Sequence, residues 1–313
     1  LANIGRAQVQ EDHWQRLNKL AELLDRKLEP MESYLDLTSR NAQYFYLNRV
    51  PLIPDTAPYN MASASQQMNA IQRLEENLPR LALLEGQNII HDGGGLALRN
   101  HYMYRFVIEH YEPFEIDGFV IGLSKEAIER GDWEDVSVPS SILRAELFEK
   151  AFSRTRVDYR KLPVAWGQSI ESLSARMESL IGPDKFNISA THHVQIENKK
   201  IFNVTGNDPF IVLDLSDNQL SGHSAGILTF DFKCRFQRHE PKIQIFWWGD
   251  DQKGAFEENS LFFSANNGTL IVPLDAAPRW YLLNQVKGLR IDLHNAEACH
   301  SFTIENLSLN KRL

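Results

Sequence analysis

The first half of the chain alternates short apolar runs with longer segments in which apolar residues recur every three or four positions. The longer segments have the spacing of amphipathic helices, and they cover residues 11–28, 65–77, 98–111 and 139–154. The apolar runs resemble β-strands in length and composition, and they cover residues 34–37, 80–85 and 114–123. Asp117-Gly118 divides the last run and predicts a hairpin turn. Because strands alternate with helices, the pattern predicts an α/β domain that is Rossmann-like and has a largely parallel sheet.

Beyond residue 185 the spacing changes to short runs in which apolar and polar residues alternate, as in strands with one buried face. These runs cover residues 188–196, 201–204, 210–215, 227–232, 243–248, 261–264, 269–274, 289–293 and 302–309. Turn-forming pairs such as Asn267-Gly268 and Lys287-Gly288 separate them. This spacing predicts an antiparallel β-sandwich of the jelly-roll type.

Together the two patterns predict an α+β protein of two domains, and 313 residues are enough to form a core in each. We expect the α/β domain over residues 1–167, a linker helix over residues 168–184 and the β-sandwich over residues 185–313. The sequence begins at Leu1 instead of Met, so we expect a fragment of a longer protein.

Composition and charge narrow the choice of partners. Hydrophobic residues make up 43% of the chain and charged residues 24%, which is typical of a folded globular protein. The formal net charge is -8, so the chain has no overall basic field to attract a nucleic acid, and nucleic acid is not expected as a partner. No apolar run approaches the roughly 20 residues that a membrane-spanning helix needs.

Cysteines and carboxylates in the second half leave two questions open. Cys234 and Cys299 could form a disulfide in an oxidising compartment, or could be free thiols in a core. The stretch Asp250, Asp251, Glu257 and Glu258 is rich in oxygen ligands and could bind calcium, although a solvated acidic loop is the favoured interpretation. We expect no other cofactor and no metal.

Two turns in the first half carry residues that could bind a phosphate or a sugar. The first turn contains Asp36, Thr38, Arg40 and Asn41 between an apolar run and an aromatic segment, where helix amides can bind an anion. The second contains Asp92 in the run HDGGG, followed by Arg99. Helix capping explains the first turn equally well, and a flexible connector explains the second. If both turns lie at one edge of the sheet, they form a composite anion or sugar site.

Tryptophans in the second half are candidates for sugar binding, because a sugar ring stacks its C–H face on an aromatic ring while planar polar groups bind its hydroxyls. The stretch Trp247, Trp248 and Asp250 supplies both features, and so does the pair Trp280 and Tyr281. Adjacent residues of a strand face opposite ways, so one of Trp247 and Trp248 belongs to the core. Trp280 follows Pro278 in a turn-like setting that favours exposure. We find no motif that assigns a catalytic residue.

The first half, over residues 11–125, resembles the soluble extracytoplasmic region of bacterial membrane glycosyltransferases that use polyprenyl-phosphate-linked sugars, the dolichyl-phosphate-mannose protein mannosyltransferase-like superfamily. The resemblance is carried by residues 34–42, 44–45, 50–51, 66–74, 81–84 and 99–111. It implies a location on the periplasmic face of the bacterial inner membrane. It also implies that the catalytic carboxylate belongs to a membrane-embedded part of the same protein that is not in this sequence. The second half is similar to the β-sandwich of carbohydrate-binding modules, down to an alternating last strand at residues 301–309.

Three hypotheses follow from these patterns. The first is an accessory region of a membrane glycosyltransferase, which binds or positions a glycan or a polyprenyl-phosphate-linked sugar. The second is a stand-alone carbohydrate-active enzyme with its site in the α/β domain. The third is a non-catalytic interaction module.

Overall fold

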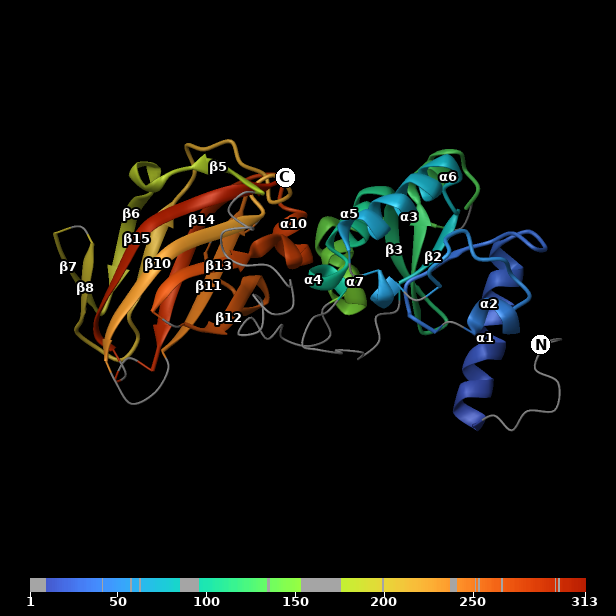
Figure 1. Cartoon of the computed structure of the whole chain (residues 1–313), viewed down its shortest axis with the longest axis horizontal. Helices are drawn as coiled ribbons and strands as arrows, with labels where there is room; N and C mark the ends of the chain where they lie inside the picture. Colours follow the sequence, from blue (N-terminus) through green and yellow to red (C-terminus); the bar gives the residue numbers. More distant parts are fainter. Residues whose placement is uncertain are drawn as a thin grey trace. The chain divides into compact units, whose positions relative to one another are not determined.

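The computed structural model describes two compact units, which are considered separately (Figure 1). Of the described residues, those up to Phe152 belong to the first unit and those from Arg176 to the second. The described ranges are residues 10–40, 42–56, 58–61, 63–84, 96–133, 136–152, 176–198, 200–236, 241–250, 252, 254–265, 267–295, 297 and 299–313. The predicted boundary at residue 167 lies outside these ranges and stays a prediction.

Helices of the first unit follow the predicted spacing closely. The longer ones are α1 (Glu11–Lys27), α3 (Ala64–Glu76), α5 (His101–His110) and α7 (Ser141–Phe152). The shorter ones are α2 (Gln43–Tyr46), α4 (Leu96–Arg99) and α6 (Lys125–Glu129). At the start of α3, the Ser63 side chain and Gln66 form a reciprocal capping box. Among the described residues, each helix is too short or too polar to span a bilayer.

The sheet of the first unit is mixed, which corrects the expectation of a largely parallel, Rossmann-like sheet. Its strands are β1 (Leu35–Asp36), β2 (Leu81–Leu83), β3 (Tyr111–Ile116) and β4 (Phe119–Ser124), in the order β1-β2-β4-β3. The pair β1 and β2 is parallel, as expected, but β4 pairs antiparallel with both β2 and β3. The reason is the hairpin predicted at Asp117-Gly118: both residues have positive φ, 54° and 81°, and a turn of two residues can only join antiparallel strands.

One face of this sheet packs against α1. Leu20, Leu23 and Leu24 of the helix join Leu81 and Leu83 of β2 in a single buried cluster with alternate residues of β4. On the hairpin, α7 contacts both β3 and β4. The amphipathic pattern of residues 11–28 therefore corresponds to this packing, because the apolar side of the helix is the side that faces the sheet.

Strands of the second unit form two antiparallel sheets. They are β5 (Met177–Ile181), β6 (Asn187–His192), β7 (Val194–Glu197), β8 (Ile201–Val204), β9 (Phe210–Asp214), β10 (Ile227–Phe236), β11 (Lys242–Gly249), β12 (Ser260–Ser264), β13 (Gly268–Pro273), β14 (Val286–His294) and β15 (Cys299–Arg312). The β15 sheet has the order β13-β10-β15-β8-β7, with β5 also paired to β15, and the β11 sheet has the order β12-β11-β14-β9-β6. The α+β architecture with a β-sandwich is thus confirmed.

Two predicted elements of the second half need correction. Of the linker helix expected over residues 168–184, residues 168–175 lie outside the described ranges, and Met177–Ile181 is a strand paired with the end of β15. This pairing satisfies the backbone of the segment through a partner far along the chain, which local spacing cannot reveal. The predicted run 188–196 is divided at His193, whose φ of 49° turns the chain from β6 in one sheet to β7 in the other.

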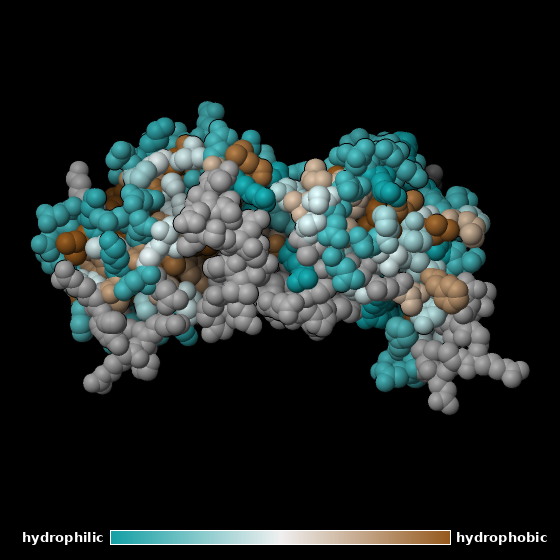
Figure 2. All heavy atoms as spheres, in the orientation of Figure 1, coloured by the Kyte–Doolittle hydropathy of each residue, from teal (hydrophilic) through white to brown (hydrophobic). Residues whose placement is uncertain are grey.

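The core of the sandwich lies between the two sheets and follows the two-residue period of the strands. In β10 the buried side chains include Ile227, Leu228, Phe230, Phe232 and Cys234, and in β11 they include Ile243, Ile245 and Trp247. On the side of the molecule drawn in Figure 2, hydrophilic residues cover most of the described surface, and hydrophobic residues show as separate patches.

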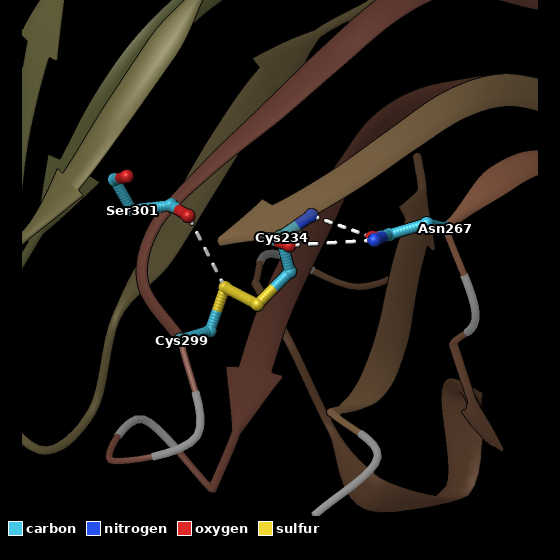
Figure 3. The surroundings of a disulfide bond; sticks show 4 residues. All are labelled: Cys234, Asn267, Cys299 and Ser301. Atoms are coloured by element: carbon cyan, nitrogen blue, oxygen red, sulfur yellow. Dashed lines mark hydrogen bonds between the residues drawn. A yellow bond between two sulfur atoms is a disulfide. The ribbon is translucent and has the colours of Figure 1, made fainter. Parts of the chain in front are cut away.

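Cys234 of β10 and Cys299 at the start of β15 form a disulfide between neighbouring strands (Figure 3), which decides between the two alternatives left open by the sequence. Their Cα atoms are 5.7 Å apart. The side chain of Asn267 holds the backbone of Cys234 through two hydrogen bonds. The backbone N–H of Cys234 donates to Oδ1 of Asn267 over 2.7 Å, and Nδ2 of Asn267 donates to the Cys234 carbonyl over 3.4 Å. The disulfide therefore links β10 covalently to β15, the last strand of the second unit.

Replacing both cysteines with serine (Cys234→Ser, Cys299→Ser) should lower the free energy of unfolding of the second unit by about 2–4 kcal/mol, because the bond closes a long loop in the unfolded chain. Denaturant unfolding with and without a reducing agent measures this. The reductant should bring the wild type down to the double variant and leave the variant unchanged. Equal stability of the oxidised wild type and the variant would contradict the expectation.

Candidate functional site

The outward side of the β11 sheet carries aromatic and charged side chains at opposing positions of neighbouring strands, and we call it the β11 face. Its central residues, in register across β11 and β14, are the pairs Trp248 with Gly288, Phe246 with Arg290, and Gln244 with Asp292. Phe210 of β9 lies opposite Asp292, and His192 of β6 lies opposite Phe210. Alternation along β11 places these residues on the side opposite Ile243, Ile245 and Trp247. Trp248 and Arg290 are partly exposed on this face, whereas Phe246, Gln244 and Asp292 are buried.

The indole of Trp248 lies against the glycine opposite it. A Cβ atom placed on Gly288 would lie 2.1 Å from Cζ2 of Trp248 and 2.5 Å from Cε2, so the indole occupies the space that any other residue would fill. Trp248 is partly exposed. One side of the ring is therefore supported by the backbone of β14, and the ring forms a flat apolar surface on the sheet.

Arg290, two residues after Gly288 in β14, contacts two aromatic rings and a carboxylate. Its guanidinium carbon lies 3.7 Å from the ring centroid of Phe210 and 5.2 Å from that of Phe246. Its Nε donates to Oδ1 of Asp292 over 2.7 Å, and its Nη2 donates to Oδ2 of the same carboxylate. Contacts with two rings and a carboxylate restrain the guanidinium, while 24% of the side chain stays exposed.

Asp292 and Gln244 extend the polar part of the face. Burial raises the pKa of Asp292, and the hydrogen bonds and charge of Arg290 oppose that rise. Nε2 of Gln244 donates to Glu257 over 3.0 Å and to Ser260 over 2.8 Å, and its Oε1 lies 2.9 Å from Nε2 of His294. Because the amide oxygen can only accept, we assign the proton to Nε2 of His294.

The two outward sides of the sandwich differ in chemistry. In β10 and β15 the outward residues are short or charged: Thr229, Asp231, Lys233, Thr303, Glu305 and Ser308. The β11 face instead combines a flat ring with planar hydrogen-bonding groups whose positions are fixed by their neighbours. Such a combination suits a ligand that has both an apolar face and several hydroxyl groups.

Three of the residues expected to bind a glycan are in the core instead. Trp247 and Trp280 are 1% and 0% exposed, and their rings meet edge to face with centroids 5.7 Å apart. Tyr281 is 4% exposed. The setting after Pro278 is a short helix, α10 (Pro278–Tyr281), which points Trp280 inward, where its Nε1 donates to the Ala225 carbonyl over 3.0 Å. The expectation that one of Trp247 and Trp248 serves the core is confirmed.

The acidic stretch makes one contact with β14 and one with the β11 face. Asp250 lies 3.2 Å from Nζ of Lys287, and Glu257 accepts the hydrogen bond from Gln244. Asp251 lies outside the described residues. Within the ranges that the structure describes, no group of three or more side chains could hold a metal ion.

In the first unit, Asp36 and Thr38 form an internal hydrogen-bonded turn, which corrects their expected role in binding phosphate or sugar. Both are 1% exposed. Oδ1 of Asp36 accepts from the backbone N–H of Thr38 over 2.7 Å and from its hydroxyl over 2.6 Å, and Oδ2 accepts from Nε2 of Gln43. Burial raises the pKa of Asp36, and these hydrogen bonds oppose the rise. A buried carboxylate at this turn disfavours an anion.

The remaining candidates of the two turns are not brought together by the described structure. Asn41 and Asp92 lie outside the described residues. Arg40 follows the Asp36 turn, and Arg99 ends α4; both are partly exposed. A binding role for these four residues stays a prediction.

Sequence reasoning missed Phe210, Gly288, Arg290 and Asp292. A signal for them existed, because Arg290 and Asp292 are two residues apart in a run of otherwise apolar residues and therefore share one side of a strand. Gly288 was interpreted only as part of a turn, although it lies inside β14 opposite Trp248. Recognising its role requires the register between the two strands.

Comparisons with known proteins give structural neighbours for the second unit only at low similarity. No protein-family model matches the sequence, and no curated protein matches it. A low-affinity xylan-binding module of family 86 from the gut symbiont Roseburia intestinalis is 8% identical with a TM-score of 0.31, and the match covers 44% of this chain and 95% of that module. A variant of a family 29 carbohydrate-binding module is 20% identical with a TM-score of 0.28, covering 41% and 83%.

A further family 29 variant, solved with cellulohexaose, is 17% identical with a TM-score of 0.29, and the match covers 43% of this chain and 89% of that one. At these identities and TM-scores, the function of this chain has to be argued from its own residues.

Gly288→Ala should displace the Trp248 indole, because the added Cβ overlaps the ring, and should cost about 1–3 kcal/mol of stability. The indole N–H resonance of Trp248 in a two-dimensional NMR spectrum reports the displacement. Gly182→Ala is the matched control, since a Cβ at Gly182 meets nothing within 4 Å. An unmoved Trp248 resonance in Gly288→Ala would contradict the packing of the ring on Gly288.

Asp36→Asn should remove a pH-dependent contribution to stability. The raised pKa means that folded Asp36 keeps its proton to higher pH than the unfolded chain, so its contribution is full below the unfolded pKa of about 3.9 and is lost as pH rises through the folded value. Relative to wild type, the variant should be least stable in acid and should recover towards neutral pH. Urea unfolding of both chains across that range measures the difference, with Glu22→Gln on the exposed side of α1 as control. A pH-independent difference contradicts the assignment.

Proposed function

We propose that the second unit is a non-catalytic glycan-binding module whose site is the β11 face. The observation that carries the proposal is the Trp248 ring, which is partly exposed and packs on Gly288 next to the hydrogen-bonded pair Arg290 and Asp292. A sugar ring can stack its C–H face on the exposed side of the indole, and its hydroxyls can then reach the guanidinium of Arg290 one strand away, whose side chain is 24% exposed. Residues diagonally opposed on neighbouring strands lie about 7–8 Å apart, which is within reach of one sugar and its neighbour.

Rigidity supports the same proposal. Trp248, Arg290 and Asp292 are held by contacts within the chain, so a ligand does not have to order them on binding, and that saves conformational entropy. The ligands named for neighbouring structures, mannohexaose and cellulohexaose, are suitable first probes for this chain.

Location and context belong to the proposal as well. The disulfide between Cys234 and Cys299 favours an oxidising, extracytoplasmic compartment, where glycans of the cell envelope are within reach. The relation of the first unit to membrane glycosyltransferases, which the sequence suggests, stays a prediction, because no family model matches the chain. The binding module does not depend on that relation.

Trp248→Ala should weaken glycan binding at least about tenfold, which corresponds to about 1.4 kcal/mol, because it removes the stacking surface. Isothermal titration of the full chain with mannohexaose and cellulohexaose, and affinity electrophoresis in soluble polysaccharides, measure the effect. Phe45→Ala is the matched control: Phe45 is an aromatic residue of the first unit that is 61% exposed, and its loss should leave binding unchanged.

Two results would count against the proposal. Wild-type protein that binds none of a broad panel of polysaccharides excludes a glycan site on this face. Binding that survives Trp248→Ala but is lost in Phe45→Ala places the site in the first unit instead.

A further inference from the structure

A row of stacked side chains runs across β14, β9 and β6 on the β11 face. Arg290 of β14 lies against one side of the Phe210 ring, with its guanidinium carbon 3.7 Å from the centroid. His192 of β6 stacks on the same ring, with centroids 5.0 Å apart and planes 23° apart. The ring of His193 lies 3.9 Å from that of His192. The guanidinium of the proposed site is thus connected by direct contact to an imidazole pair at the edge of the sheet.

The end of this row is anchored where the chain passes from one sheet to the other. The His193 ring packs on Gly206, where a Cβ would lie 2.5 Å from it. Its Nδ1 accepts a hydrogen bond from the backbone N–H of Asp208 over 3.3 Å, and its carbonyl accepts one from Thr205 over 2.9 Å. An Nδ1 that accepts cannot carry a proton, so this arrangement requires the neutral imidazole of His193.

We propose that His192 is a positioning residue of the β11 face: its neutral imidazole supports Phe210, and through it Arg290, so that acidification loosens the pair formed by Arg290 and Asp292. The consequence for ligand affinity rests on the proposed function of this face. Histidine is the side chain that ordinarily changes its charge between about pH 5 and 8, which makes the support sensitive to mild acid.

Other charged or titratable groups lie close to His192 in the stack. Arg290 already places a cation on the other side of Phe210, and His193 brings a second titratable ring within 3.9 Å. Two carboxylates belong to this surrounding: Asp292, which is bound to Arg290, and Asp208, whose backbone N–H donates to His193 and whose charge acts on Asp292. Protonation of both imidazoles puts two like charges in contact, and solvent screens that repulsion only in part because the rings touch.

The test compares the full wild-type chain with His192→Phe, which keeps an aromatic ring in the stack but cannot titrate. The first readout needs no ligand: the Nε–H resonance of Arg290 is followed from about pH 7.5 to about pH 5.5, the range in which imidazoles titrate. Because the Nε–H of Arg290 donates to Asp292, titration of Asp292 moves this signal in both chains. The informative quantity is therefore the difference in movement between the wild type and His192→Phe. We expect a larger movement in the wild type, and Lys233→Ala, on the outward side of the β15 sheet, should behave like the wild type.

The second readout is glycan affinity at the same two pH values. We expect the wild type to lose about threefold on acidification and His192→Phe to hold its affinity, in line with the modest size of exposed charge interactions. Identical Arg290 movements in the two chains, or affinity losses of equal size, overturn the positioning role. If the wild type binds no glycan at either pH, the proposed function fails, while the Arg290 resonance still decides the role of His192.

Discussion

The alternation of side chains along β11 is the constraint on which the second unit depends. Ile243, Ile245 and Trp247 enter the core, and the residues between them form the outward face. A shift of one residue in the pairing with β14 would exchange these two sets, removing Trp247 from its contact with Trp280 and turning the polar residues towards the other sheet. Core and candidate site are therefore specified by the same register, and neither can change without the other.

Much of the architecture is visible in the sequence because it depends on local spacing. Helix α1, the hairpin at Asp117-Gly118 and the change of pattern after residue 185 all correspond to elements of the structure. Local spacing does not specify which strand pairs with which. The first sheet is mixed because β4, and not β3, lies next to β2, and Met177–Ile181 is a strand because the far end of β15 pairs with it.

The candidate site shows the same limit at the level of single residues. The rule that adjacent strand residues face opposite ways separates Trp247 from Trp248, but it does not say which of them is outside. The exposure expected for Trp280 failed because a helix of one turn after Pro278 points its ring inward. The roles of Gly288 and Arg290 in the site depend on the pairing of β14 with β11 and β9, which are distant from it in sequence.

The position of β15 has a consequence for the order in which the second unit can be assembled. This strand, Cys299–Arg312, lies between β10 and β8 and also pairs with β5, yet it is made last of these four. During synthesis the β15 sheet would lack its middle, leaving open edges on β10 and β8, until Cys299–Arg312 has also left the ribosome. Completion of this sheet is therefore a late event that depends on contacts of long sequence separation, which slow folding and lengthen the time during which its edges are exposed to other chains.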